Sequence, residues 1–281
     1  MPGSAGSASD SPLGKSVSYC DQYAPELLFP IPRQEKRDEI GIAGGTPLPF
    51  VGEDLWNAYE LSWLTPRGKP VVALAEFRVP AHSPRLIESK SFKLYLNSFN
   101  QTALDSVDAL VELLVKDLSA AAGAPVGVRV MPLGERPVRR LGAPEGELLD
   151  TLDIDIGSYA GPQSALLTIG DGAEVDETLY SHLLKSNCLV TGQPDWGMLV
   201  VRYVGAPIDR AGLLRYIVSF RQHNEFHEQC VERVFMDITR RCRPRRLEVW
   251  ARYTRRGGLD INPWRSSHPA SPPDNVGEIR Q

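Results

Sequence analysis

One stretch of this chain occurs in two versions. Residues 87–100 read IESKSFKLYLNSFN, and residues 208–221 read IDRAGLLRYIVSFR. Both versions begin with isoleucine and an acidic residue, and both contain the motif Tyr-x-x-Ser-Phe near their end. Chance could supply this motif once, so the elements on either side decide whether the chain contains a repeat.

The flanks of the first version predict a β-hairpin, a helix and a strand. Residues 57–64 alternate in polarity, residues 71–79 are rich in β-forming residues, and the turn-forming segment TPRGKP lies between them. A cap candidate at Asp105 or Ser106 precedes apolar side chains at helical spacing, which are Val107, Leu110, Val111, Leu114 and Leu118. A further strand is expected at residues 126–130.

The second version has matching flanks. Aligning the two stretches places Glu88 on Asp209, and the same offset lays residues 126–130 on residues 247–251. A second helix is expected from the spacing of Val231, Val234, Phe235 and Ile238. The sequence therefore predicts a duplicated α+β module, with antiparallel sheets whose apolar faces are covered by helices on one side.

These patterns divide the chain into three parts. Residues 1–45 are rich in proline and lack periodicity, which predicts an extended N-terminal arm. Residues 46–140 form the first module, and residues 141–281 comprise a linker and the second module. Within the linker, residues 152–156 and 166–169 are predicted as short strands.

Composition indicates an ordinary soluble protein of one large or two modest domains. The chain has 281 residues, 42% of them hydrophobic, and a net charge of −4. No signal peptide or bilayer-spanning run is evident. The four cysteines, at positions 20, 188, 230 and 242, show no CxxC spacing, which favours reduced thiols in the cytoplasm and no structural metal site.

A cysteine and an aspartate flank a tight loop at residues 183–197, LLKSNCLVTGQPDWG. Pro194 suits the second position of a turn and Asp195 the third, so Asp195 is expected beside whatever the loop surrounds. Cys188 is then a candidate nucleophile. A small buried thiol and an ordinary turn aspartate are the common alternative at this spacing.

Residues 219–230, SFRQHNEFHEQC, are expected at the start of a helix that Asn224 could cap. His227 and Glu228 are consecutive, so they point about a hundred degrees apart and are not both expected to face the core. One of them is predicted to face a pocket or solvent. The alternative for His223 and His227 is a surface pair, since no third metal ligand has suitable spacing.

Two basic segments are candidates for phosphate binding. On a helix, Lys90 and Lys93 would share a face with Ser89 or Ser91, which suits phosphate binding, although lysine pairs commonly form a solvated face. Arg256 and Gly257 lie in the segment RRGG, which suits close approach of the backbone to phosphate or a polar surface loop.

Together these segments resemble the bimodular 7-cyano-7-deazaguanine reductases over nearly the whole chain, from Leu13 to Arg265. ESKSFKLY at residues 88–95 is similar to the family's signature for NADPH binding. Other similar blocks are Cys188 with TGQPDWG, FHE at residues 226–228, and YTRRGGLDINPW at residues 253–264.

The resemblance implies a cytoplasmic, metal-free, NADPH-dependent enzyme of tRNA queuosine biosynthesis that reduces a nitrile to an amine. Its fold is expected to consist of tandem tunnelling-fold modules in an oligomeric barrel, here a homodimer, with active sites at module or subunit interfaces. Cys188 is expected to add to the nitrile and form a thioimide, because a nitrile carbon accepts hydride poorly on its own. Asp195 is expected to donate a proton, and His227 to orient the substrate or its proton transfers.

The same resemblance assigns the binding residues. Glu228 and Glu88 are expected to accept hydrogen bonds from the guanine-like face of the substrate, a small deazapurine. Ile87 and Ser89 line that pocket, and Phe226 can stack on the ring. The cofactor-binding residues are Ser89, Lys90, Lys93, Arg256 and Gly257. No GxGxxG motif follows a predicted strand, so no Rossmann domain is expected.

Two other classes stay open. One is a tunnelling-fold pterin or GTP enzyme, which binds a similar heterocycle and whose hydrolytic members need zinc. The other is an RNA-binding module that uses the basic segment from Arg240 to Arg256, although the acidic balance of the chain and the lack of interleaved aromatic residues disfavour nucleic acid as a partner.

Overall fold

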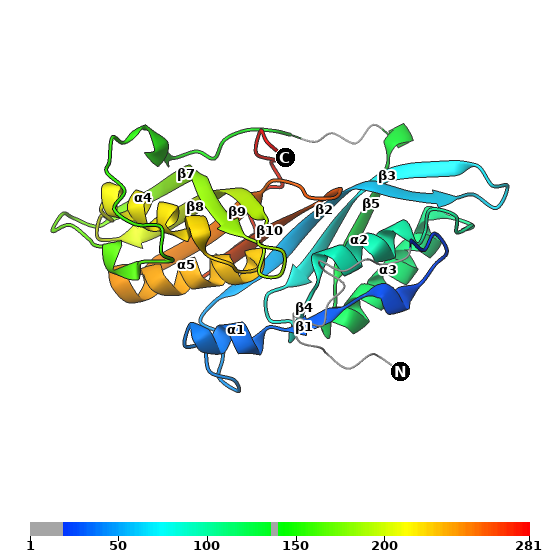
Figure 1. The fold of residues 1–281 in the computed structure, drawn as a ribbon, viewed down its shortest axis with the longest axis horizontal. Helices are drawn as coiled ribbons and strands as arrows, with labels where there is room; N and C mark the ends of the chain where they lie inside the picture. The colour runs from blue at the N-terminus through cyan, green and yellow to red at the C-terminus, as the bar shows by residue number, and fades with distance from the viewer. Residues whose placement is uncertain (1–18, 136–139) are drawn as a thin grey trace. The chain divides into compact units, whose positions relative to one another are not determined.

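A computed structural model describes residues 19–135 and 140–281 (Figure 1). The chain divides into two compact units. Unit 1 comprises residues 1–35, 53–139 and 255–261, and unit 2 comprises residues 36–52, 140–254 and 262–281. Residues 1–18 of the expected arm and residues 136–139 of the expected linker lie outside the described part.

Unit 1 contains the predicted hairpin. Strands β2 (Val51–Leu64) and β3 (Pro70–Pro80) pair antiparallel around a turn at Thr65–Lys69, and β5 (Gly127–Pro132) pairs antiparallel with β3. The strand order β5-β3-β2 gives one face on which alternate side chains are apolar and buried. The sequence predictions of the hairpin and of the strand after it are confirmed.

Two helices cover that face, α2 (Ser89–Asn97) and α3 (Val107–Ala122). Ser106 begins α3 by accepting a hydrogen bond on Oγ from the amide of Ala109 at 3.1 Å, which confirms it as the cap. Gly123 ends α3 with φ of 75°, where an added Cβ atom would lie 2.7 Å from Cγ of Pro84. The shared core includes Trp56, Phe77, Phe92, Leu110, Leu114 and Leu118.

The segment expected to be an extended arm contains regular elements. A short 3₁₀ helix spans Pro25–Leu27, strand β1 (Pro30–Pro32) pairs antiparallel with β4 (Arg85–Ile87), and helix α1 spans Gln34–Glu39. Arg33 is buried and bonds to Asp54 at 2.5 Å. These contacts are made with residues far away in the sequence, so local periodicity does not reveal them.

Most strands of unit 2 also pair antiparallel. Strands β7 (Val175–Asn187), β8 (Pro194–Gly205) and β9 (Arg246–Tyr253) are antiparallel neighbours. The end of β10 (Leu259–Ser266) pairs with β9, and β6 (Glu147–Leu148) runs parallel to β7. Helices α4 (Arg210–Ser219) and α5 (His227–Cys242) lie across one face of this sheet in Figure 1. The mixed α+β architecture with antiparallel sheets and helices on one face is confirmed.

A buried ion cluster joins residues of unit 2. Glu232 on α5 accepts hydrogen bonds from Arg37 at 2.8 and 2.9 Å and from Arg265 at 2.8 and 3.1 Å. Both guanidinium groups also lie over the ring of Phe50, at 5.7 and 5.5 Å from its centroid. All of these side chains are almost fully buried, so the ion pairs are shielded from solvent.

The two strands predicted in the linker are wrong. The 3₁₀ helices of this region span Leu149–Thr151 and Ser164–Leu166, and residues 152–156 have no regular structure. Of residues 166–169, Ile169 makes a single isolated bridge to Ile208. These apolar runs are short and have no neighbouring strand with which to form a ladder.

The predicted repeat is visible in side-chain contacts as well as in element order. In each unit a long antiparallel strand pair is followed by two helices and then a strand, with the short β4 inserted before α2 in unit 1. Glu88 caps α2 and its counterpart Asp209 caps α4. Tyr95 donates a hydrogen bond to Asp117 at 2.8 Å, and Tyr216 donates one to Asp237 at 2.6 Å. Among the described residues, no helix is both long enough and apolar enough to cross a membrane.

Candidate active site

The hairpin of β7 and β8 carries Cys188 and Asp195. The amide of Cys188 donates to the carbonyl of Gln193 at 2.8 Å, and the amide of Gly192 donates to the carbonyl of Cys188 at 3.0 Å. Gly192 has φ of 66°, which this tight turn requires. The prediction of a turn at Pro194 and Asp195 is wrong, because both residues already belong to β8 and the turn precedes them.

Asp195 pairs across the hairpin with Ser186, on the face of the sheet that the helices cover. It is 4% exposed, and Cys188 is 6% exposed. Oδ2 of Asp195 lies 3.3 Å from Nε2 of His227, the first residue of α5. The hairpin and the start of α5 therefore bring the predicted catalytic aspartate and histidine together.

The start of α5 differs from the prediction. Phe226 occupies the capping position without a side-chain cap, and Asn224 instead accepts a hydrogen bond from the side chain of Asn187 at 3.1 Å. The loop before the helix is held by Glu225, which bonds to Arg233 at 2.7 Å and to His223 at 3.1 Å. Burial alone raises the pKa of Glu225, but these two partners outweigh it and hold the pKa below its usual value.

Glu228 is buried, and His227 is partly buried at the start of α5. Glu228 is 3% exposed and the His227 side chain is 11% exposed. The His227 ring stacks on Tyr253, the last residue of β9, with centroids 3.8 Å apart and an interplanar angle of 7°. Because Tyr253 covers its face, His227 is shielded from solvent although it starts a helix.

Several buried polar atoms around this stack lack a hydrogen bond of normal geometry. They are Ser186 Oγ, His227 Nδ1, the Tyr253 hydroxyl and the side-chain amide of Gln229. Burial, together with the neighbouring Cys230 and Asp195, raises the pKa of Tyr253 well above its ordinary value. Burial also raises the pKa of Cys230 to about 12, with Glu225 adding to the effect.

Sequence reasoning assigned no role to Tyr253 or Ser186. Tyr253 opens the block at residues 253–264, but nothing local marks it as a partner of His227. The only sequence signal is indirect, since the cross-strand partner of Tyr253 is Gly197, the last residue of TGQPDWG. A glycine and an aromatic residue that face each other on neighbouring strands can be paired from the sequence only if the register of the strands is known.

In unit 1, Glu88 is used as a helix cap. Its two carboxylate oxygens accept hydrogen bonds from the amides of Lys90 and Ser91, each at 2.7 Å. Burial raises the pKa of Glu88, while these two backbone bonds act in the opposite direction. Ile87, at the end of β4, is also buried, so the two residues lie together at the start of α2.

The predicted phosphate-binding segments of unit 1 are adjacent. A Cβ atom added at Gly257 would lie 3.0 Å from Cδ and 3.1 Å from Nζ of Lys93, so only glycine leaves room here. Gly257 has φ of 59°. Lys93 Nζ lies 3.7 Å from Glu60, and Lys90 and Ser89 are half-buried at the start of α2. A glycine turn beside lysines suits the phosphates of a dinucleotide, so these residues fit NADPH.

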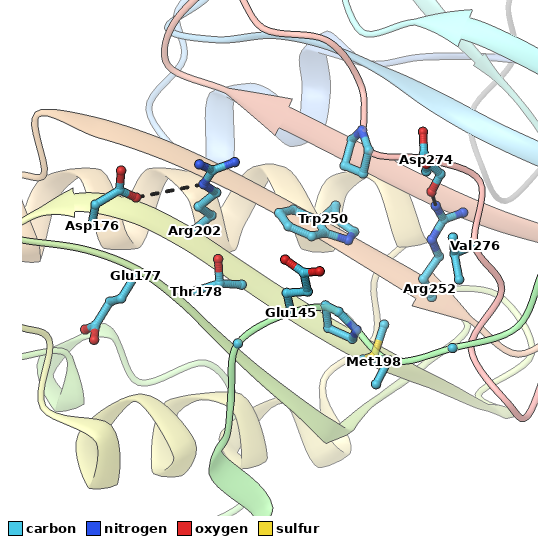
Figure 2. A pocket seen from close by; sticks show the side chains of 15 residues that line it. Glu145, Asp176, Glu177, Thr178, Met198, Arg202, Trp250, Arg252, Asp274 and Val276 are labelled. Carbon is cyan, nitrogen blue, oxygen red and sulfur yellow. Dashed lines mark hydrogen bonds and ion pairs between the residues drawn. The ribbon is translucent and has the colours of Figure 1, made fainter.

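A cavity of about 570 Å³ lies on the other face of the unit 2 sheet (Figure 2). Its walls include Trp250 and Met198, and the side chains of Arg202 and Asp176 approach to 3.9 Å at one end. Alternate residues of β8 and β9 separate this cavity from the face that carries Asp195 and Tyr253. None of the predicted site residues lines it. Among the described residues, no cluster of three or more side chains suitable for a metal ion was found.

The predicted site residues thus fall into two groups, one in each unit. Unit 2 holds Cys188, Asp195, Phe226, His227 and Glu228. Unit 1 holds Ile87, Glu88, Ser89, Lys90, Lys93, Arg256 and Gly257. Each group is assembled by the fold of its own unit.

Comparison with known proteins agrees with the resemblance seen in the motifs. A family model described as the N-terminal part of a nitrile reductase, 7-cyano-7-deazaguanine reductase, matches residues 19–130. A second model, described as a QueF-like protein, matches residues 194–272. Three similar proteins are each named NADPH-dependent 7-cyano-7-deazaguanine reductase. The protein from Azoarcus sp. strain BH72 is 69% identical over 98% of this chain and 96% of its own length. The protein from Aromatoleum aromaticum is 66% identical over 98% of this chain and 96% of its own length. The protein from Ralstonia nicotianae is 60% identical over 96% of this chain and 98% of its own length. This chain therefore belongs to the family of NADPH-dependent 7-cyano-7-deazaguanine reductases.

Proposed function

We propose that Cys188, Asp195 and His227 carry out the reaction of the family on a covalently bound substrate. As a member of this family, the chain is an oxidoreductase that reduces the nitrile of 7-cyano-7-deazaguanine with NADPH. The product that this chemistry yields is the aminomethyl compound, an intermediate of queuosine biosynthesis in our proposal. The observation that carries the assignment of residues is the 3.3 Å approach of Asp195 to His227 on the hairpin that also holds Cys188.

Cys188 is the nucleophile in this proposal. Its sulfur bonds to the nitrile carbon, its proton passes to the Asp195 carboxylate, and Asp195 gives that proton to the nitrile nitrogen. The product of these transfers is a thioimide on Cys188, whose carbon accepts hydride more readily than the nitrile does. His227 holds Asp195 in place through the contact at 3.3 Å and exchanges protons with it.

The cofactor group lies in unit 1. Two NADPH molecules, bound one after the other, would each supply one hydride, and these two hydrides with two protons convert the nitrile to an amine. Lys90, Lys93 and Arg256 are proposed to bind its phosphates, with Ser89 as a hydrogen-bond donor. Gly257 allows the phosphates to approach the backbone, because a side chain there would displace Lys93.

The ring is recognised by carboxylates. A guanine-like edge presents an N–H and an amine side by side, and a carboxylate can accept both hydrogen bonds. We assign this role to Glu228 and Glu88, with Ile87 and Ser89 lining the pocket and Phe226 stacking on the ring. Oε1 of Glu88 accepts hydrogen bonds from the Lys90 amide and, at 3.4 Å, from Ser89 Oγ, while Oε2 accepts one from the Ser91 amide. In this proposal the ligand bonds to Oε2 and replaces Ser89 Oγ at Oε1.

We further propose that the two modules are of the tunnelling-fold type and that the enzyme works as a homodimer around a common barrel in the cytoplasm. The tunnelling-fold assignment is supported by the repeated series of a long antiparallel strand pair, two helices and a strand, with the helices on one face of the strands. In this proposal catalysis needs the unit 1 group as well as the unit 2 group. Nucleic acid is not a partner in this proposal, in which the ligand is a small deazapurine.

The test is to incubate the protein with 7-cyano-7-deazaguanine in the absence of NADPH and to measure its intact mass. We expect an adduct whose mass equals that of the nitrile. Cys188→Ala should abolish both the adduct and the reduction, and Cys188→Ser should do the same, because a hydroxyl is much harder to deprotonate than a thiol. An adduct that persists in Cys188→Ala places the nucleophile elsewhere.

Two other activities predict different results. A pterin or GTP enzyme of hydrolytic type should contain zinc and form no adduct with the nitrile. An RNA-binding module should bind RNA with an affinity that falls steeply with salt and is unaffected by the nitrile.

A further inference from the structure

We propose that Tyr253 is the positioning residue of the catalytic pair, and that its ring fixes the plane of the His227 imidazole so that Nε2 faces Asp195. This inference rests on the proposed roles of Asp195 and His227. It assigns a task to a residue that has no proposed contact with the substrate, the cofactor or the reacting atoms.

The geometry of the stack is the first argument. The two rings are nearly parallel, at 7°, with centroids 3.8 Å apart, so rotation of the imidazole would drive it into the phenol ring. The remaining contact that fixes His227 is Nε2 to Asp195 Oδ2 at 3.3 Å, while Nδ1 is buried without a hydrogen bond. One polar contact does not define the plane of a ring. The stack on Tyr253 supplies the second constraint, which fixes the plane of the imidazole.

The sheet holds Tyr253 itself in place. Tyr253 is fully buried, ends β9, and lies directly opposite Gly197 on β8. A Cβ atom at position 197 would lie 3.1 Å from Cδ1 and 3.3 Å from Cε1 of the ring. Gly197, two residues after Asp195, therefore leaves the space that the Tyr253 ring occupies. Strand β8 thus carries both the catalytic carboxylate and the glycine that makes room for Tyr253.

The ring and the hydroxyl of Tyr253 can be separated. The hydroxyl faces Ser186 and Cys230, and it has no hydrogen bond that meets the usual limits of distance and angle. We therefore assign the positioning to the ring alone. This choice distinguishes a stacking support from a hydrogen-bonded relay, because phenylalanine can replace the first and cannot replace the second.

The test measures steady-state reduction of 7-cyano-7-deazaguanine with NADPH in Tyr253→Phe and Tyr253→Leu. We expect Tyr253→Leu to lower kcat by about 10- to 100-fold, since misplacing a catalytic group by about 1 Å can cost that much. The KM for the nitrile should stay within about threefold. Tyr253→Phe should restore kcat to within about threefold of the original protein. Gly197→Ala, which pushes on the same ring, should lower kcat in the same way without changing Tyr253.

Tyr203→Leu is the matched control. Tyr203 is buried on the same face of β8, and its hydroxyl accepts a hydrogen bond from the amide of Ile208 at 2.7 Å, but its ring does not stack on His227. This variant should lose stability while the folded protein keeps kcat within about threefold. If Tyr253→Phe is as impaired as Tyr253→Leu, or if Tyr253→Leu changes KM and not kcat, the positioning role is refuted. If Cys188→Ala also retains the adduct, the proposed function fails instead, independently of any result at Tyr253.

Discussion

Glu232 is a single buried side chain that binds two arginines from distant parts of the sequence. It forms ion pairs with both Arg37 and Arg265 in a buried site, with Phe50 beside the guanidinium groups. We expect Glu232→Gln to lower the free energy of unfolding by about 3–5 kcal/mol, because it removes the negative charge that faces two buried guanidinium groups. Urea denaturation measures the change.

Lys36→Ala is the control for this prediction. It removes an exposed ion pair of the same helical segment, with Glu39 at 2.6 Å, and should cost less than about 1 kcal/mol. If both substitutions lowered the free energy of unfolding equally, burial would not be the reason for the stabilisation by Glu232.

Substrate and cofactor contacts can also be separated at single residues. Glu228→Gln should impair formation of the adduct without NADPH, since an amide cannot accept both hydrogen bonds of the guanine-like edge. Arg256→Ala should leave that adduct intact and raise the NADPH concentration needed for half-saturation. Stopped-flow measurement of adduct formation and titration of reduction with NADPH give the two quantities. Equal damage to adduct formation in both variants would contradict the division of the site.

At the scale of single residues, the sequence predicts a site residue best when its partner lies close by in the chain. Cys188 and Asp195 were found because one short loop contains both, and His227 because it lies in a recognisable block. The contact of His227 with Tyr253 joins an α-helix to a strand end 26 positions later, and it depends on the register of β8 and β9. The burial of Glu228 likewise depends on groups from other elements.

At the scale of elements, three helices of the repeat, α2, α3 and α4, begin at a residue whose side chain accepts a hydrogen bond from a backbone amide. Asp209 begins α4 by accepting a hydrogen bond on Oδ2 from the amide of Gly212 at 2.9 Å. Asp209→Ala should lower the free energy of unfolding by about 1 kcal/mol, as loss of a helix cap commonly does. Asp209→Asn keeps an acceptor at this position and should cost only a few tenths of that. Thermal or urea denaturation of the pair checks the prediction, which a larger loss in the asparagine variant would overturn.

Elements with a strong local pattern were predicted well. The β2 and β3 hairpin has alternating polarity and a turn segment, and α3 has apolar residues at helical spacing after Ser106. Residues 152–156 looked like a strand but had no neighbour to pair with. Conversely, β1 consists of Pro30–Pro32, a composition that disfavours a strand, and exists because β4 pairs with it. The local sequence pattern predicted an element correctly where that element also has a partner in the fold. It failed where pairing with a distant strand decides whether a strand forms.

At the scale of the whole molecule, we expect one active site per chain. The first half has no cysteine between Cys20 and Cys188, and the second half has Arg210 and Ala211 where the first has Ser89 and Lys90. Titration with the nitrile should saturate at about one adduct per chain in intact-mass spectra. Glu88→Leu in unit 1 should strongly reduce chemistry at Cys188 in unit 2.

Ser106→Ala is the control for that long-range effect, because it removes a helix cap from unit 1 without touching a proposed site residue. It should lower stability and leave adduct formation unchanged. Two adducts per chain, or normal chemistry in Glu88→Leu, would contradict a single site that draws on both halves.

Buried thiols should make the folded protein sensitive to alkali. Burial raises the pKa of Cys230 from the ordinary value of 9.0 to about 12, and that of Cys242 to about 11. The unfolded chain therefore releases these protons at lower pH than the folded chain does. The free energy of unfolding should not depend on these thiols below about pH 8 and should fall between about pH 9 and pH 12.

Cys230→Ala should reduce this slope by up to about 1.4 kcal/mol per pH unit, whereas Cys20→Ala, at a half-exposed position, serves as the control. Urea denaturation at a series of pH values gives the slopes. An unchanged slope in Cys230→Ala would show that this thiol ionises alike in the folded and unfolded chains.

The hydrogen bonds of Tyr95 to Asp117 and of Tyr216 to Asp237 give the same tyrosine–aspartate contact once in each half of the repeat. The same two chemical groups meet at equivalent places of two related modules, with the same solvent, temperature and polypeptide. Removing each hydroxyl with phenylalanine, singly and together, would measure one bond twice. The difference between the two results would report how far the surroundings have drifted since the halves were alike, and the double variant would report whether the halves unfold as one.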